Sequence, residues 1–169
     1  MEEGWLLPVR SVGVQGDSRS YAHVLAIEQV QHDRATELIN RISGINRVVA
    51  HVAGHAALPE MQVLESSLTP ERLARLRRAD AIVRRLSNDH GFDRQIWQFP
   101  VILIPLGTNQ RPDSVVLRPV DSVDGMTARS VTMPDSLLQT IAAELLQLDG
   151  ISAVFYDLTH KPPGTIEWE

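Results

Sequence analysis

A glycine turn near the amino terminus brings together side chains that could hold an anion. The segment reads Val12-Gly13-Val14-Gln15-Gly16-Asp17-Ser18-Arg19-Ser20-Tyr21. Gly16 allows a positive φ and a close backbone approach, and Arg19 offers a planar fork of N–H donors for phosphate or carboxylate. Asp17 adds an acceptor beside it. A plain hairpin in which Asp17 and Arg19 pair only with each other explains the same residues, and on local chemistry alone it is the simpler interpretation.

The carboxyl terminus is the second segment that could carry chemistry, and it reads His160-Lys161-Pro162-Pro163-Gly164-Thr165-Ile166-Glu167-Trp168-Glu169. Two prolines and a glycine make a stiff loop with Lys161 at its base and Glu167 beyond it, and Trp168 can anchor the end. A lysine is a compact charge suited to phosphate, and a carboxylate accepts hydrogen bonds from base N–H or ribose hydroxyl groups. Lys161 is the only lysine among 16 cationic side chains, which suggests a position where arginine is not acceptable.

The composition excludes several classes of protein. The chain has 169 residues, which fits one domain of ordinary size. It carries 16 basic and 21 acidic side chains, whereas a general nucleic-acid binder normally has the opposite balance. Cysteine is absent, which excludes a disulfide framework, a thiolate nucleophile and a cysteine-ligated metal site. His51 and His55 are four residues apart, but they flank a predicted strand end rather than a helix, so no metal site is expected there.

No segment indicates secretion or a membrane. Residues 1–3 are Met-Glu-Glu, acidic where a signal peptide has a basic region. The most apolar stretch, residues 99–106, is about ten residues short of a membrane span. We therefore expect a soluble, cytoplasmic protein.

Apolar patterns predict six strands and three helices. The strands are expected over 9–14, 23–30, 45–52, 99–106, 114–120 and 151–158. The helices are expected as a short helix capped by Asp33 and closed by Gly44, a long helix over 70–88 with Thr69 as its N-cap, and a helix opened by Pro134 and ended by Gly150.

The order strand, strand, helix, strand occurs twice, which indicates an internal duplication of a β-β-α-β unit. Residues 44–49 and 150–155 occupy equivalent places directly after the two shorter helices. We predict a first unit over 1–55, a linking segment with the long helix over 56–95, and a second unit over 96–169. The expected fold class is α+β with two layers, a mixed or antiparallel sheet, and helices on one face.

The long helix is rich in arginine. Its Arg side chains either form a surface for an anionic partner or lie on a solvated face partly neutralised by Glu71 and Asp80. Because the chain is acidic overall, the solvated face is the preferred interpretation. The six arginines are Arg72, Arg75, Arg77, Arg78, Arg84 and Arg85.

Together these segments resemble the C-terminal dimerisation domain of glutamine-hydrolysing GMP synthase. Residues 6–21 are similar to the start of that domain, and residues 116–120, 126–128 and 156–169 are similar to its end. The resemblance covers essentially the whole chain. The spacing resembles the longer form of the enzyme, known in animals among others, in which the domain holds two copies of the unit; residues 98–103 resemble the start of the second copy. The resemblance therefore favours the duplication.

The resemblance implies a role in making GMP from XMP, ATP and glutamine. In the family, a glutaminase domain releases ammonia, an ATP-pyrophosphatase domain adenylates XMP, and the C-terminal domain helps to bind XMP and to form dimers. His160 stands where many relatives have serine, beside the ligand site. Carried over by position, the XMP contacts are Asp17, Gln98, Lys161 and Glu167, with Arg19 as a phosphate partner.

The resemblance also shows what this segment lacks. The glutaminase needs a cysteine nucleophile and the pyrophosphatase needs a Ser-Gly-Gly loop, and the sequence contains no cysteine and no adjacent pair of glycines. We therefore expect no catalytic residue and no cofactor in this chain, with ATP and Mg bound by the ATP-pyrophosphatase domain. The expected partners are XMP, the other two domains, and a second copy of the chain unless the two units satisfy each other. The alternative is a free-standing purine-nucleotide-binding or interaction module without turnover.

Overall fold

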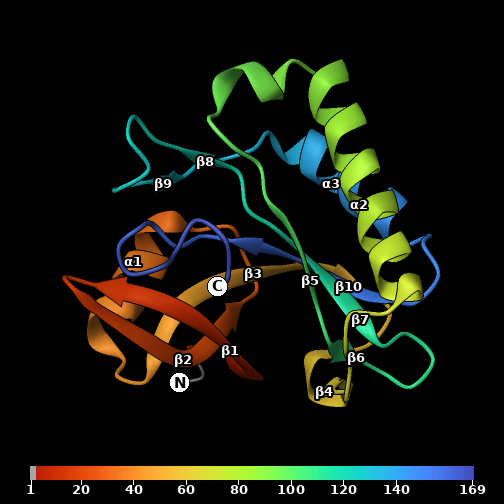
Figure 1. Ribbon diagram of the computed structural model, residues 1–169, viewed down its shortest axis with the longest axis horizontal. Coiled ribbons are helices and arrows are strands. Elements are labelled where there is room, and N and C mark those ends of the chain that lie inside the picture. The colour runs from red at the N-terminus through yellow and green to blue at the C-terminus, as the bar shows by residue number, and fades with distance from the viewer. Residues whose placement is uncertain (1–2) are drawn as a thin grey trace.

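The protein folds around one curled, mixed sheet of six strands (Figure 1). The computed structural model describes residues 3–169. Across the sheet the strands are β1 (Trp5–Gln15), β2 (Ser18–Ile27), β3 (Ile45–Gly54), β10 (Ile151–Asp157), β7 (Asp113–Leu117) and β5 (Val101–Ile104). The helices are α1 (His32–Arg41), α2 (Pro70–Asp89) and α3 (Asp135–Leu145), with 3₁₀ turns over Leu58–Glu60 and Phe92–Gln95. Two small ladders pair β4 (Gln62–Val63) with β6 (Leu106–Gly107) and β8 (Val120–Asp121) with β9 (Arg129–Ser130).

The two halves of the sheet repeat one arrangement. In the first half β1 is antiparallel to β2 and β2 is parallel to β3. In the second half β5 is antiparallel to β7 and β7 is parallel to β10. The halves meet where β3 and β10 pair antiparallel at the centre, as a pseudo-twofold axis requires. Both parallel pairs shift register directly after their first pair of residues. That first pair is His23–Ile45 in one half and Asp113–Ile151 in the other.

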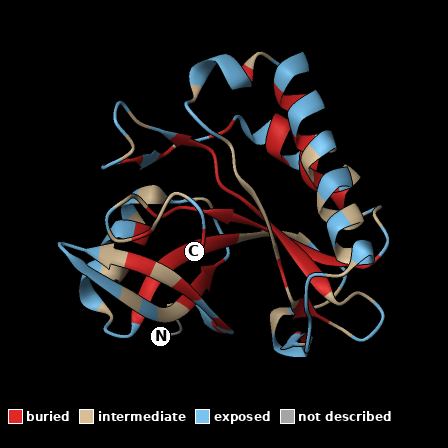
Figure 2. Cartoon of the chain, in the orientation of Figure 1, coloured by how far each residue is buried: buried red, intermediate tan, exposed pale blue. Residues whose placement is uncertain are grey.

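All three helices pack on one face of the sheet. Buried residues of α1, α2 and α3 share a core with Val48, Val154 and Tyr156 of the central strands, which are coloured as buried in Figure 2. The opposite face has its own core, closed by Met61, Leu106 and Trp168 rather than by a helix. The predicted α+β fold with duplicated units and helices on one face is confirmed, while the unit boundaries at 55 and 95 stay predictions.

Several element ends differ from the expected ones. Asp33 is not an N-cap: α1 begins at His32 after Gln31, and Asp33 lies in its first turn. Thr69 does cap α2, because its Oγ1 accepts the Arg72 N–H at 3.2 Å. The predicted strand over 99–106 divides into β5 and β6 around Pro105, which has no N–H to donate to a ladder. The β8–β9 ladder was not predicted, because its two-residue strands carry no apolar alternation.

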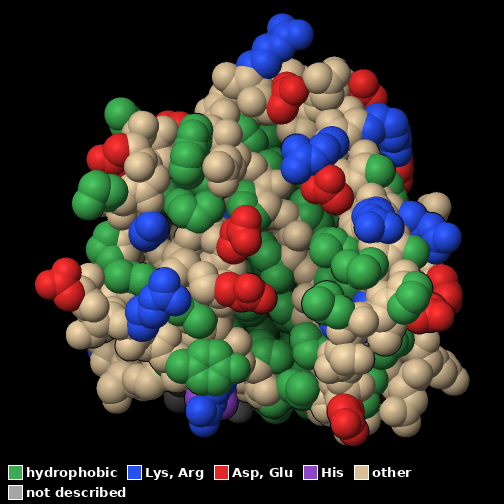
Figure 3. Space-filling model, in the orientation of Figure 1, with side chains coloured by type: hydrophobic (Ala, Val, Ile, Leu, Met, Phe, Trp, Pro, Cys, Tyr) green, Lys and Arg blue, Asp and Glu red, His purple; other side chains and the backbone are tan. Residues whose placement is uncertain are grey.

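The arginine face of α2, visible as blue side chains in Figure 3, is partly structural. Asp113, which is buried, accepts Arg72 at 3.0 Å and Arg75 at 2.6 Å, so α2 is fixed to the start of β7. Arg84 pairs with Asp80 on the same helix at 2.8 Å. No helix within residues 3–169 combines the length and apolarity needed to cross a membrane.

Candidate functional site

The segment after β10 leaves the second half of the sheet and lies along β1 of the first half. The Val14 N–H donates to the Pro163 carbonyl at 2.6 Å, and the Val12 N–H donates to the Trp168 carbonyl at 3.1 Å. Between these bonds Gly13 lies opposite Gly164, where a Cβ on Gly13 would come within 2.7 Å of the Pro163 oxygen. The C-terminal loop (residues 158–169) is therefore packed against the strand that leads into the Asp17–Arg19 turn.

A fully buried ion cluster lies beneath this loop. Asp157 accepts Arg47 at 2.7 Å and Arg118 at 3.2 Å, and all three side chains are inaccessible to solvent. Burial opposes ionisation of Asp157, but the adjacent Arg118 and Arg47 charges outweigh it and hold the pKa of the carboxyl below its ordinary value. Burial lowers the pKa of Arg118 to about 10, so its guanidinium stays charged at neutral pH. Buried charges of this kind need every donor and acceptor satisfied.

The two arginines satisfy their remaining donors on the loop backbone. Arg47 Nη2 donates to the Thr165 hydroxyl at 2.7 Å and to the Glu167 carbonyl at 2.8 Å. Arg118 donates to the Ile166 carbonyl through Nε and to the Thr165 carbonyl through Nη2, at 2.7 Å and 2.8 Å. These bonds fix the path of the backbone that carries Glu167.

Trp168 attaches the end of the chain to the buried ion cluster. Its indole Nε1–H donates to Asp157 at 2.9 Å, and the Arg47 guanidinium lies 5.2 Å from the indole ring centre. The terminus is thus anchored in the core, in agreement with the anchoring role expected of Trp168.

Lys161 is tied to the loop between β8 and β9. Its Nζ donates to the Gly125 carbonyl at 2.8 Å, and its backbone exchanges two hydrogen bonds with Ala128. Gln98 borders the same segment, because its backbone exchanges two hydrogen bonds with Val120 at the start of β8. Lys161 and Gln98 therefore flank a single hairpin, although 62 residues lie between them in the sequence.

The structure brings the segments that carry all five predicted site residues to the C-terminal loop. The Asp17–Arg19 turn joins it through β1, Gln98 through the β8–β9 hairpin, and Lys161 and Glu167 belong to it. Within residues 3–169, the exposed side chains of Asp17, Arg19, Gln98 and Glu167 have no protein hydrogen-bond or ion-pair partner. Asp17 and Arg19 therefore do not pair with each other, and their side chains are available to a ligand.

Two histidines stack beside the loop. The rings of His32 and His160 lie 6.1 Å apart and nearly parallel, and both contact Ser130. Burial lowers the pKa of His32, and the nearby His160 lowers it further. Burial also lowers the pKa of His160, with smaller contributions from Arg129 and Arg118. Both rings are therefore favoured in the neutral form.

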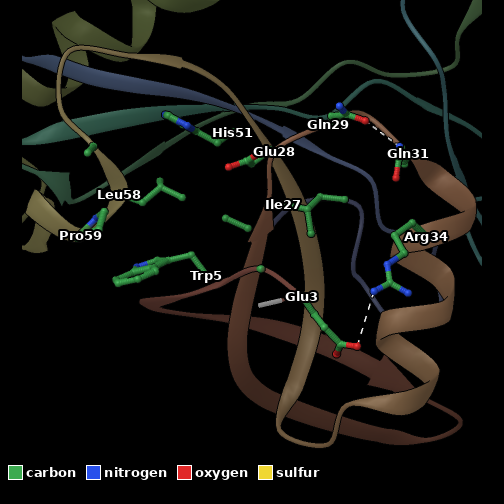
Figure 4. A pocket seen from close by; sticks show the side chains of 13 residues that line it. Glu3, Trp5, Ile27, Glu28, Gln29, Gln31, Arg34, His51, Leu58 and Pro59 are labelled. Carbon is green, nitrogen blue, oxygen red and sulfur yellow. Dashed lines mark hydrogen bonds and ion pairs between the residues drawn. The ribbon is translucent and has the colours of Figure 1, made fainter. Parts of the chain in front are cut away.

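A cavity of about 780 Å³ lies elsewhere, and its lining contains none of the five predicted residues. It lies where β1 starts and β2 ends. Figure 4 shows Trp5 and Leu58 toward one side and the ion pair of Glu3 with Arg34 toward the other.

The sequence analysis missed the cluster of Arg47, Arg118 and Asp157. Arg47 precedes the apolar pair Val48-Val49, and Arg118 follows the buried run that ends at Leu117. An arginine within an apolar strand context is the signal that could have indicated a buried partner.

Comparison with known proteins finds relatives that share one name. The family model described as GMP synthase C terminal domain matches residues 86–168. A protein of Leptospira interrogans named "Probable GMP synthase", glutamine-hydrolyzing, is 42% identical over 174 residues, which cover 98% of this chain and 29% of the relative. The glutamine-hydrolyzing GMP synthase of Nitratidesulfovibrio vulgaris is 31% identical over 195 residues, covering 100% of this chain and 38% of the relative. The glutamine-hydrolyzing GMP synthase of Thermosynechococcus vestitus is 44% identical over 110 residues, which cover 60% of this chain and 21% of the relative.

These matches agree on one part of one enzyme. The chain spans between about a fifth and two fifths of the length of these relatives. It belongs to the family of GMP synthase C-terminal domains.

Proposed function

We propose that this chain is the C-terminal region of a glutamine-hydrolysing GMP synthase and supplies part of the site that holds XMP. The single observation that supports this proposal is that the segments carrying the five residues meet at the C-terminal loop. Four of their side chains are exposed and have no partner within residues 3–169, and the fifth, Lys161, bonds only to a backbone carbonyl. The family match supports the same assignment.

Each residue type suits a part of a purine nucleotide. Lys161 and Arg19 are the cations for the phosphate group, one a compact charge and the other a planar fork. Glu167 can accept hydrogen bonds from base N–H or ribose hydroxyl groups, and Asp17 and Gln98 provide further acceptors and an amide donor. Clamping the backbone of residues 165–167 before the ligand arrives lowers the ordering cost of binding.

In this proposal the chemistry takes place on other domains of the complete enzyme. The reaction converts XMP, ATP and glutamine into GMP, AMP, diphosphate and glutamate. The glutaminase domain would supply the cysteine that this sequence lacks. The ATP-pyrophosphatase domain would bind ATP and Mg; within residues 3–169 no group of three or more His, Asp or Glu side chains is placed to hold a metal ion.

A second proposed contribution is association of two copies. β5 ends the sheet, and an edge strand presents unpaired N–H and C=O groups that can pair with another chain. Sedimentation equilibrium of the chain over a range of concentrations measures this directly, and a single monomeric mass at all concentrations would remove it.

The nucleotide proposal is tested by titrating XMP into the complete enzyme and into this chain by calorimetry. We expect weak binding to the chain, because the rest of the pocket lies on another domain, and loss of affinity when Lys161 or Glu167 is replaced. Arg77→Gln is the matched control, since Arg77 lies exposed on α2, away from the loop. Equal XMP affinity in the Lys161, Glu167 and Arg77 variants of the complete enzyme would refute the assignment.

A further inference from the structure

A small cleft of about 470 Å³ lies between the end of β3 and the loop that joins β6 to β7. Among residues 3–169, none of those that line it is acidic, although the chain carries a net charge of −5. A carboxylate-free cleft with basic side chains favours an anionic occupant. It is lined by His55, Ala56, Thr108, Asn109, Gln110, Arg111 and Ser152.

Two polar groups of the cleft have unused hydrogen-bonding capacity. Ser152 is fully buried, and within residues 3–169 its hydroxyl has no hydrogen-bond partner. A buried hydroxyl without a partner is costly, so a ligand that accepts its proton would be favoured. Arg111 is half-buried, and among residues 3–169 only its Nη1 is engaged within the guanidinium, with the Ile151 carbonyl at 3.2 Å. The remaining guanidinium N–H groups can bind two oxygens of one anion.

The other groups of the cleft are held in place. His55 Nε2 lies 2.8 Å from the Leu146 carbonyl, which can only accept, so Nε2 carries a proton and the ring is held in place. The backbones of Thr108 and Arg111 exchange two hydrogen bonds, at 2.9 Å and 3.2 Å, and these fix the turn between them. The cleft is therefore largely formed before a ligand arrives.

The pseudo-twofold axis relates this cleft to the junction that holds Lys161. Gly44 and Gly150 precede β3 and β10 with φ of 86° and 80°, so Ile45 corresponds to Ile151. Continuing that register, Asn46 corresponds to Ser152 and His55 to Lys161.

At the counterpart junction, side-chain hydrogen bonds connect β3 to β1 and β2. There the Asn46 amide reaches the Ser11 carbonyl at 2.8 Å and the Ser20 hydroxyl at 3.1 Å. The Ser152 hydroxyl makes no corresponding hydrogen bond within residues 3–169.

We propose that this cleft is a binding site for a phosphate group, free or carried by a nucleotide. Arg111 binds two phosphate oxygens, Ser152 donates its hydroxyl proton to a third, and His55 closes the cleft from the β3 side. The site is separate from the C-terminal loop and does not depend on XMP binding there.

The test is an NMR titration of the ¹⁵N-labelled chain with inorganic phosphate at constant ionic strength. We expect saturable shifts of the Arg111 side-chain Nε–H and of the backbone amides of residues 108–111 and Ser152. Arg111→Gln should weaken the affinity at least tenfold. Arg77→Gln removes the same charge from an exposed position on α2 and should leave the affinity unchanged.

A second variant keeps the test decisive if Arg111→Gln unfolds the protein. Ser152→Ala removes a hydroxyl that has no partner within residues 3–169, so it should fold normally and still bind phosphate several-fold more weakly. Shifts that increase linearly without saturation, or equal losses in the Arg77 and Arg111 variants, would overturn the proposal.

Two further arms identify the source of the phosphate and the location of the site. If AMP shifts the same amides with higher affinity than inorganic phosphate does, the cleft is a nucleotide site. Equal affinities of AMP and inorganic phosphate identify a site for free phosphate. Lys161→Ala should leave these shifts intact, whether or not the C-terminal loop binds XMP. Their disappearance in that variant would assign the binding to the C-terminal loop and refute the cleft.

Discussion

Arg47 and Asp157 form a solvent-inaccessible ion pair of 2.7 Å between strands that belong to different halves of the duplicated sheet. Arg47 extends its other donors to the backbone at Thr165 and Glu167, while Asp157 accepts the Trp168 indole. One pair therefore joins the central strands to the loop that carries the proposed ligand contacts. We therefore expect replacement of either residue to affect both the stability of the fold and the proposed ligand binding.

Replacement of Asp157 by asparagine should be severely destabilising. The change leaves Arg47 and Arg118 buried without a counter-charge, and breaking a buried pair in this way typically costs about 3–5 kcal/mol. Urea denaturation of the chain measures the loss. Asp80→Asn, which breaks the largely exposed pair with Arg84, is the control and should cost about 0–1 kcal/mol. Similar losses in the two variants would show that the Asp157 cluster contributes no more than a surface pair.

Gly13→Ala should release the C-terminal loop from β1. A Cβ at Gly13 would lie 2.7 Å from the Pro163 oxygen and 2.8 Å from the Asn46 amide nitrogen, so the loop backbone must move away. We expect faster amide hydrogen exchange at residues 12, 14 and 164. Gly16→Ala is the contrasting variant, because its Cβ would meet nothing within 4 Å and only the backbone conformation at φ 62° is unfavourable. Unchanged exchange in the Gly13 variant would contradict this packing.

The free energy of unfolding should fall as the pH drops below the ordinary range of histidine titration, about 6.5. His32, His51 and His160 have pKa values lowered in the folded state, mainly by burial. The unfolded chain then binds more protons, so stability is complete above that range and is lost as the pH falls toward the folded pKa values. His160→Asn should make the slope of stability against pH shallower between pH 5.5 and 6.5. Denaturant titrations at several pH values measure it, and an unchanged slope would exclude His160 as a contributor.

The order of strands and helices along the chain and the repeated unit could be predicted because they depend on local patterns. The apolar alternation and the glycines before β3 and β10 are visible in the sequence, and they led to the correct fold class. The break of the predicted strand at Pro105 and the β8–β9 hairpin were missed. The hairpin is bordered by bridges from Gln98 to Val120 and from Lys161 to Ala128, which its own short sequence pattern does not indicate.

The buried ion cluster of Arg47, Arg118 and Asp157 could not be predicted from the spacing of these residues in the sequence. Arg47 and Asp157 are distant in the sequence, and an arginine is normally assigned to the surface. Only the pairing of β3 with β10 brings them to the same place in the sheet. The site residues were reached through the resemblance of their motifs, and their roles stay predictions until a ligand is measured.

Lys161→Ala should weaken XMP binding in the complete enzyme by about 1–3 kcal/mol, the range for a charge-assisted hydrogen bond. Its Nζ contacts only the Gly125 carbonyl among residues 3–169, so its removal should leave the stability of the fold nearly unchanged. Lys161→Arg keeps the charge but replaces a compact ammonium by a bulky planar fork, and we expect it to restore binding only in part. Calorimetry with XMP, together with urea denaturation of each variant, separates the two effects. Full affinity in Lys161→Ala would show that the lone lysine serves the β8–β9 loop and not the nucleotide.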